Sequence, residues 1–227
     1  MAASQEAPRD LVKKAAAKET ETETARSQYT YRQTVVMEEL DDRGAKAGEY
    51  REIRDIIFSP KQERTEQPIG KPTLNLKRLK LTEEDFRDMR EVQPILLSEH
   101  VLWIYETKFR GEEKVDDTDC YVLQVRPRQI LQGQRLFDGL LWINKTDYSI
   151  VRAQGQAVPQ IRGTKSENLF PRFTTIRRPV DGKHWFPMHT HADDTLYFRT
   201  GPQRVRLTIR YSRYQRFGAE STVTFQK

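Results

Sequence analysis

The chain has 227 residues, of which 36% are hydrophobic and 32% charged, and its formal net charge is +6 at pH 7. This length suits one large all-β domain or two small ones, and the hydrophobic content is too high for a disordered chain. The sequence contains no run of about 18 apolar residues, so we expect a chain that does not span a membrane.

Charge is spread unevenly along the chain. Residues 1–113 carry 20 Lys or Arg and 23 Asp or Glu, a net charge of −3, whereas residues 114–227 carry 19 and 10, a net charge of +9. The basic half is either a solvated face or a surface for an anionic partner. Cys120 is the single cysteine, which excludes an intrachain disulfide, and its place in a strand-like run predicts an inert buried thiol.

The first predicted elements are a helix and a β-hairpin. Residues 8–26 are rich in Ala, Lys and Glu, which favours a helix that docks by one narrow apolar face. A β-branched and aromatic run over residues 29–40 predicts a strand, and residues 50–58 return after a polar loop. Alternation with period two places four apolar residues on one face of the first strand: Tyr29, Tyr31, Val35 and Met37.

The next predicted elements are an edge segment and a second helix. Residues 60–72 are polar and broken by prolines, so they should form an edge or a loop. Thr82 is a good N-cap for a helix over residues 81–92, because three acidic residues follow it at the positive end of the helix dipole.

The second half of the chain is typical of a meander of antiparallel strands. Its clearest hairpin is FDGLLWINKTDYSIVR, where apolar segments flank the turn formers of residues 144–147. Asp181-Gly182 predicts a two-residue turn, and residues 204–211 alternate basic with apolar side chains, which predicts one buried and one basic face. The candidate strands are residues 100–109, 119–126, 136–143, 148–156, 168–177, 183–191, 195–199, 205–214 and 221–226.

About eleven strands with only two helices predict a mainly β fold of the α+β class. We expect a curved antiparallel sheet, or open half-barrel, with covering helices. Residues 1–27 should form a helix that is part of the same domain. Residues 28–227 should form a single half-barrel domain with a helical insertion near residues 81–92.

The sequence lacks the common catalytic motifs, since it contains no GxSxG, P-loop, GxGxxG or HExxH pattern. In KHWFPMHTHADD, His189 and His191 would project from one face of a strand, and His184 or an Asp would have to supply a third metal ligand. The alternative, which we favour, is a group of polar residues at a strand end. We therefore expect no metal, no cofactor and no enzymatic activity.

Basic and aromatic residues are interleaved near the C-terminus, a pattern that also occurs in nucleic-acid binding proteins. No RNP-like, zinc-finger or helix-turn-helix pattern accompanies them. A solvated outer face is the favoured interpretation, ahead of an anionic lipid or protein surface, and we expect no nucleic-acid partner.

Several predicted strands carry large apolar residues on both faces, which a one-sided sheet does not need. One face must meet a second layer, and the other can line a hollow. Two interpretations stay open: a packed sandwich core, or an apolar cavity that accepts a lipid or acyl chain. The candidate cavity residues are Tyr29, Tyr31, Val35, Met37, Trp103, Tyr105 and Trp142.

The run CYVLQVRPR followed by FDGLLWINKTDYSIVRAQGQ resembles the periplasmic lipoprotein-sorting proteins of the LolA/LolB-like superfamily. The shared pattern is a strand with a basic-Pro step, a Trp-bearing strand, an Asp-containing turn and an Ile-Val strand. It is carried here by Tyr121, Leu123, Val125, Pro127, Trp142, Ile143, Asp147, Tyr148, Ile150 and Val151. The resemblance covers residues 100–226 clearly and residues 1–99 loosely.

This resemblance implies a half-barrel of about eleven strands with helices over an apolar cavity. It also implies export to the periplasm, with a signal peptide removed and Met1 added to the mature chain. The predicted function is that of a non-enzymatic periplasmic binding protein for a lipid, an acyl chain or a lipoprotein. The alternative is an envelope sensor or protein-interaction module that has the same fold without a lipid cargo and meets another envelope protein.

Overall fold

The computed structural model describes residues 7–59, 63–91, 97–131, 133–162 and 167–216. Its helices are α1 (Leu11–Arg26), α2 (Glu83–Glu91) and a short 3-10 helix, η1 (Leu102–Ile104). The first strands are β1 (Tyr29–Leu40), β2 (Lys46–Phe58), β3 (Arg64–Pro68), β4 (Thr73–Leu74), β5 (Tyr105–Val115), β6 (Thr118–Pro127) and β7 (Leu136–Asn144). The remaining strands are β8 (Ile150–Val158), β9 (Ile161–Arg162), β10 (Glu167–Asn168), β11 (Phe173–Val180), β12 (His184–Phe198) and β13 (Gly201–Arg216).

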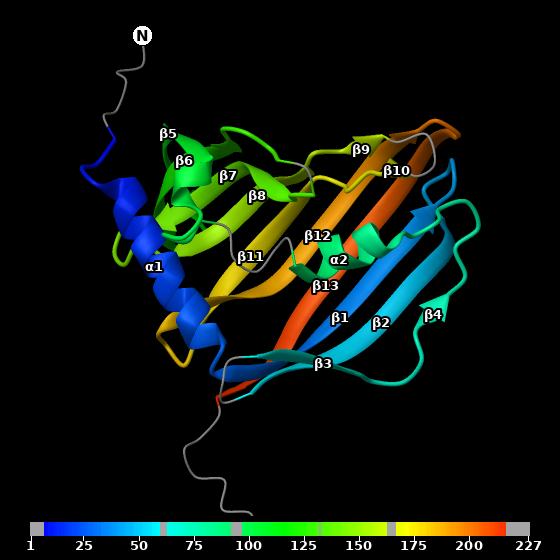
Figure 1. Cartoon of the computed structure of the whole chain (residues 1–227), viewed down its shortest axis with the longest axis horizontal. Helices are drawn as coiled ribbons and strands as arrows, with labels where there is room; N and C mark the ends of the chain where they lie inside the picture. The colour runs from blue at the N-terminus through cyan, green and yellow to red at the C-terminus, as the bar shows by residue number, and fades with distance from the viewer. Residues whose placement is uncertain (1–6, 60–62, 92–96, 132, 163–166, 217–227) are drawn as a thin grey trace, which may run out of the picture.

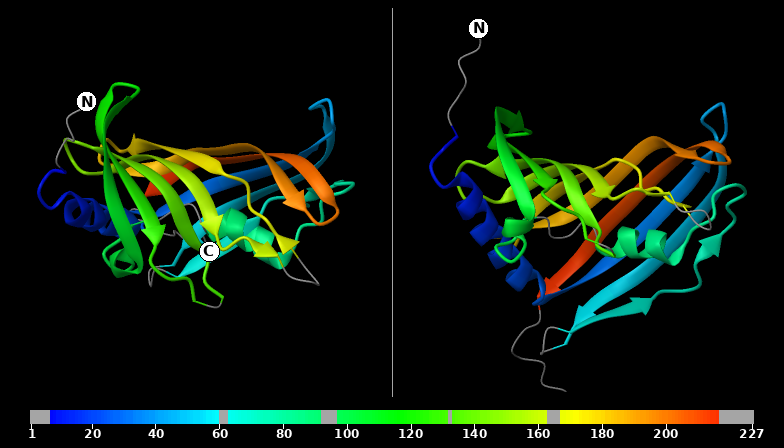
Figure 2. Two further views of the ribbon diagram at one scale, coloured as in Figure 1. Left: turned by 90° about the horizontal axis from the view of Figure 1, so that it is seen from above. Right: turned by 45° about the horizontal axis from the view of Figure 1, so that its top comes forward.

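One antiparallel sheet of eleven strands dominates the described part of the chain. Its order is β3-β2-β1-β13-β12-β11-β8-β7-β6-β5, and β4 pairs with β2 outside this path. The order runs from β3 to β5 without closing, and Figures 1 and 2 show a strongly curved, open sheet. The prediction of an antiparallel half-barrel with about eleven strands is therefore confirmed.

Helix α1 packs on the inner side of the curved sheet, as Figure 2 shows. Its buried face is narrow, because its apolar part consists of Leu11 and three alanines. Glu19 on the same face pairs with Arg177 of β11 through bonds of 2.7 and 2.8 Å, and both side chains are only 1% exposed. A buried ion pair therefore supplements the weak apolar contact that holds α1 against the sheet.

Helix α2 crosses in front of the central strands in Figure 1. The predicted N-cap is confirmed, since the Thr82 hydroxyl accepts the backbone N–H of Asp85, and the Asp85 carboxylate accepts the backbone N–H of Thr82. Asn168 donates to Asp85, and the buried Asp88 pairs with Arg135 just before β7. Burial raises the pKa of Asp85 to about 6.

The main core fills the concave side of the sheet. Alternation along β13 turns Val205, Leu207 and Ile209 inward, and each is fully buried. The residues between them point outward, which confirms the predicted basic outer face of this strand.

A close approach of two strands occurs where Gly139 of β7 lies opposite Gly155 of β8. A Cβ atom added to Gly139 would lie 2.3 Å from the carbonyl oxygen of Gln154 and 2.6 Å from the ring of Phe137. The ring of Phe137 therefore packs over two positions where only glycine fits.

The structure corrects four of the predicted strands. Residues 100–104 form a turn and η1 instead of the start of a strand, so β5 begins at Tyr105. Residues 168–177 divide between the short β10 and β11, and residues 183–199 form the single long strand β12. The predicted strand over residues 221–226 lies outside the described residues. Among the helices of the described residues, none is long and apolar enough to cross a membrane.

Candidate functional site

The inner face of β1 carries four of the seven candidate cavity residues. Tyr31, Val35 and Met37 belong to the main core and are at most 3% exposed. Tyr29 packs with Ala25 and Phe186 in a smaller cluster beside α1, and its hydroxyl donates to the Asp181 carboxylate at 2.7 Å. Burial, together with Asp181, raises the pKa of Tyr29.

Tyr105, at the start of β5, is also part of the main core. Its hydroxyl accepts the backbone N–H of Phe137 at 3.2 Å, and burial raises its pKa. The inner face thus brings together residues that lie more than 60 positions apart, from β1 to β5, as the half-barrel prediction requires.

The two tryptophans among the candidate cavity residues do not lie on the inner face. Trp103 lies in η1 and is 73% exposed, because the chain turns there before β5 begins. Trp142 is buried, but it lies on the outer face of β7 in a small cluster with Cys120 and Val122. The placement of Trp103 and Trp142 in the wall of one cavity with Tyr31 is therefore wrong.

The indole ring of Trp142 is held in the outer cluster by two polar contacts. The indole N–H donates to Glu113 at 2.8 Å, and the guanidinium of Arg152 lies 4.5 Å from the ring centroid. Burial raises the pKa of the Cys120 thiol to about 11, which fits the predicted inert cysteine.

A band of polar side chains crosses the inner face, and no local sequence pattern predicts it. Gln33 of β1 lies opposite Arg54 of β2 on one side and opposite Tyr211 of β13 on the other. Next to them, the hydroxyls of Thr175 and Thr190 are 2.8 Å apart. All five side chains are buried. Only the inward alternation of each strand, combined with the pairing register, aligns them in one band.

Three polar atoms of this band are buried without a well-formed hydrogen bond in the described part of the structure. They are Oε1 of Gln33, Nε of Arg54 and the hydroxyl of Tyr211. Burial raises the pKa of Tyr211 to about 12, although the neighbouring side chains of Gln33 and Thr190 lower it, so its hydroxyl is protonated and able to donate. An unpaired buried polar group costs about 1–3 kcal/mol, and such groups are typical of sites where a ligand or water completes the bonding.

The three histidines of the sequence cluster do not converge. The rings of His189 and His191 stack at 5.6 Å on the outer face of β12, as the period-two argument predicts. His184 instead stacks on Phe186 and lies near Lys18 of α1. Burial and the neighbouring His191 lower the pKa of His189. Among the described residues, no group of three or more His, Cys, Asp or Glu side chains could hold a metal ion.

The basic residues of β13 are largely paired across the outer face. Arg204 and Arg206 both bind Asp193 of β12, at 3.3 and 3.1 Å, and Arg206 also reaches Glu38 of β1. Such exposed pairs neutralise part of the positive charge of β13 on the outer face. The arrangement fits the solvated outer face that was favoured from the sequence.

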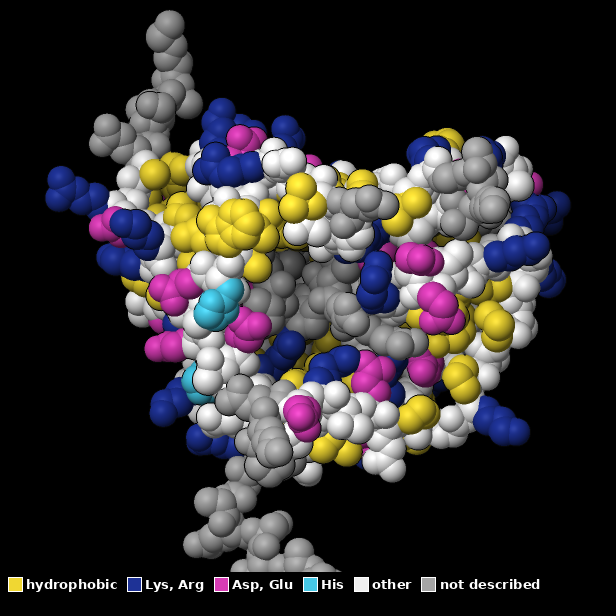
Figure 3. Space-filling model, in the orientation of Figure 1, with side chains coloured by type: hydrophobic (Ala, Val, Ile, Leu, Met, Phe, Trp, Pro, Cys, Tyr) yellow, Lys and Arg dark blue, Asp and Glu magenta, His cyan; other side chains and the backbone are white. Residues whose placement is uncertain are grey.

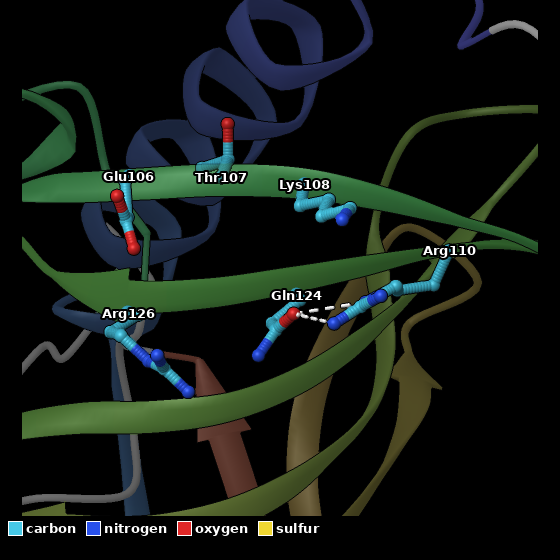
Figure 4. A pocket seen from close by; sticks show the side chains of 6 residues that line it. All are labelled: Glu106, Thr107, Lys108, Arg110, Gln124 and Arg126. Atoms are coloured by element: carbon cyan, nitrogen blue, oxygen red, sulfur yellow. Dashed lines mark hydrogen bonds between the residues drawn. The ribbon is translucent and has the colours of Figure 1, made fainter.

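A polar pocket of about 400 Å³ lies on β5 and β6 near the edge of the sheet (Figure 4). Glu106, Lys108 and Arg126 contribute charged groups to its lining, and Arg110 donates to Gln124 at 2.9 Å. Its charged lining differs from the apolar cavity that the sequence predicts.

A cleft of about 580 Å³ lies at the rim of the half-barrel, between residues 78–82 and the turn from β12 to β13. Leu79 and Phe198 in its lining pack against the main core, and Arg78, Lys80 and Arg199 surround them. This cleft therefore joins apolar core surface to cationic side chains. In the space-filling view, Lys and Arg side chains lie beside hydrophobic and acidic ones on this side of the molecule (Figure 3).

No protein-family model matches the chain, and no curated protein matches its sequence. Solved structures are similar to it over most of its length. A DUF1329 family protein from Desulfovibrio piger is 16% identical, with a TM-score of 0.40, over 93% of this chain and 95% of that one. A LolA superfamily protein from Nitrosomonas europaea is 14% identical, with a TM-score of 0.37, over 92% and 98%. A domain assigned to outer membrane lipoprotein-sorting proteins from Vibrio parahaemolyticus is 11% identical, with a TM-score of 0.41, over 93% and 95%.

Identities of 11–16% and TM-scores of 0.37–0.41 carry no conclusion about a ligand of this chain. The function of this chain is therefore inferred from its own side chains.

Proposed function

We propose that the chain is a non-enzymatic binding protein of the bacterial periplasm that holds the acyl chain of an ester-bearing lipid or lipoprotein on its concave face. The observation that carries the proposal is a pair of buried polar atoms without a well-formed hydrogen bond, on Gln33 and Tyr211, which lie on the concave face beside the apolar core. The Tyr211 hydroxyl would donate to an ester carbonyl of the ligand. The acyl chain would contact the apolar residues around it.

The energetics favour such a ligand. Each buried methylene group of an acyl chain contributes roughly 0.8 kcal/mol. One neutral hydrogen bond adds only about 1 kcal/mol, so the apolar face would supply affinity and Tyr211 would supply orientation. The narrow apolar face of α1 supports entry, because this helix relies on the Glu19–Arg177 pair and little hydrophobic surface.

The most direct test is Tyr211→Phe, which removes the hydroxyl and keeps the aromatic ring. It should raise the free energy of unfolding of the ligand-free protein by about 1 kcal/mol, because an unpaired buried hydroxyl is lost. It should also weaken binding of monoolein about five- to tenfold, because the ester loses its donor. Tyr197→Phe is the matched control, since Tyr197 is exposed, and it should change neither quantity.

Two measurements decide the outcome. Urea denaturation gives stability, and displacement of a fluorescent fatty acid gives affinity. Loss of stability in Tyr211→Phe with unchanged monoolein affinity would contradict the proposal. Mass spectrometry of an organic extract of the purified protein is a further check, and reproducible absence of lipid would count against a lipid cargo.

The second candidate function is an envelope module that binds another protein through a sheet edge. The observation that favours it is β5, which ends the strand order and pairs only with β6 along it, with the exposed Trp103 just before its start. An added strand from a partner could pair with this edge. Charged residues and a register shift at Phe109/Gly111 protect the same edge from unspecific pairing. A pull-down from envelope extract with Trp103→Ala as the comparison would test this candidate.

A further inference from the structure

We propose that the rim cleft between residues 78–82 and the β12–β13 turn is the head-group subsite of the lipid-binding face, and that it selects an anionic amphiphile. This inference rests on the proposed function and adds the charge class of the ligand. The head group would carry a carboxylate or a phosphate.

Charge in the cleft favours an anion. Arg78, Lys80 and Arg199 line it, and Glu167 is the single carboxylate among the residues that line it. Glu167 is already engaged, because it accepts the backbone N–H of Arg199 at 3.1 Å. Arg78 and Lys80 form no ion pair with any residue that the structure describes. These two cations are therefore available to a ligand.

The backbone that carries the two cations is fixed. The carboxylate of Glu39, which is 1% exposed, accepts the backbone N–H groups of Lys77, Arg78 and Leu79 at 2.9–3.2 Å. A buried carboxylate with this many donors holds the segment in one conformation. On the opposite side, the side chain of Gln203 donates to the backbone oxygen of Leu40 and anchors the start of β13. Both walls of the cleft are thus positioned before a ligand arrives.

The apolar residues of the cleft connect it to the proposed acyl site. Leu79 and Phe198 line the cleft and also pack against the main core. A ligand with its head group near Arg78 and Lys80 would therefore place the beginning of its chain on Leu79 and Phe198. This juxtaposition of cations and core surface distinguishes the cleft from the polar pocket of the outer face, whose lining is formed by polar and charged residues.

The test compares three ligands that share one oleoyl chain. Oleate carries a carboxylate, oleoyl lysophosphatidic acid carries a phosphate, and monoolein is neutral. Affinities of the full chain are measured by calorimetry at low ionic strength. We expect about three- to tenfold tighter binding of the two anions than of monoolein, because two exposed charge contacts contribute on that scale.

The double variant Arg78→Gln/Lys80→Gln should lose this preference and keep the monoolein affinity. Lys108→Gln/Lys183→Gln is the matched control, because it removes the same charge at two exposed positions outside the cleft. It should keep the preference for anions. Oleate and the phosphate ligand, measured separately, show which head group is preferred.

Equal affinity for the three ligands in the unmodified chain would overturn the inference and leave the proposed function standing. Survival of the anion preference in Arg78→Gln/Lys80→Gln would overturn it as well. If none of the three ligands binds, both the inference and the proposed function fail.

Discussion

The buried pair between Glu19 of α1 and Arg177 of β11 allows the most direct test of how the helix is held on the sheet. The perturbation is a double-mutant cycle of Glu19→Met, Arg177→Met and the double variant. Both methionines are unbranched and apolar, so each removes a charge and keeps most of the buried volume.

The expected magnitude follows from burial and geometry. Both side chains are 1% exposed, and two bonds of 2.7 and 2.8 Å join them. Each single variant leaves one buried charge without its partner, which typically costs 3–5 kcal/mol. The double variant leaves neither charge and should lose far less, so we expect a coupling energy of about 2–4 kcal/mol. A single variant thus removes a large part of a typical stability of about 5–15 kcal/mol.

Urea denaturation followed by circular dichroism measures these energies. Glu21→Gln on the same helix is the control, because its pair with Lys18 is exposed and should be worth less than about 1 kcal/mol. If the effects of the single variants add up to that of the double variant within about 0.5 kcal/mol, the ion pair does not hold the helix.

Three further predictions concern single residues. Burial raises the pKa of Asp85 to about 6, above its ordinary 3.8, so its contribution to stability is complete below pH 3.8 and is lost as the pH rises through 6. The free energy of unfolding should therefore fall by about 3 kcal/mol over that range, and Asp85→Asn should remove this fall, as denaturation at several pH values would show. An unchanged pH profile in the variant would contradict the burial argument. Cys120, fully buried with a pKa of about 11, should react with iodoacetamide at pH 8 at least about tenfold more slowly in the native protein than in urea. Gly139→Ala should lower the free energy of unfolding by about 2–3 kcal/mol in urea denaturation, because the added Cβ would lie 2.3 Å from a backbone oxygen of β8. An unchanged denaturation midpoint would show that β8 can shift to accept the Cβ without loss of stability.

Local sequence signals predicted the elements well where the alternation was regular. The bounds of β1 match the predicted strand, and the Asp181-Gly182 turn has positive φ at both positions, as a tight hairpin requires. Prediction failed at residues 100–104, where an apolar run of strand-forming residues forms a turn and η1. Short apolar runs carry no information on whether a neighbouring strand is present to pair with them.

The candidate site was only partly predictable. Tyr31, Val35 and Met37 share the inner face because their spacing alone dictates it. Trp142 follows the same alternation but lies on the outer face of the sheet. Alternation predicts that a strand has two faces, but it does not predict which of them becomes the concave one. The burial of Tyr211 follows from the alternation predicted over residues 204–211, whereas the burial of Gln33 was missed because a polar side chain within a strand has no local signal of burial.

The sequence by itself determined the class of fold, the course of most strands and the division of each strand into two faces, because these depend on spacing along the chain. Only the tertiary structure decided what each face meets. Curvature and strand pairing turned one face inward, set Glu19 against Arg177 from 158 positions away, and left the Tyr211 hydroxyl beside Gln33 without a well-formed hydrogen bond. Such contacts depend on pairings between distant segments, and no local pattern encodes them.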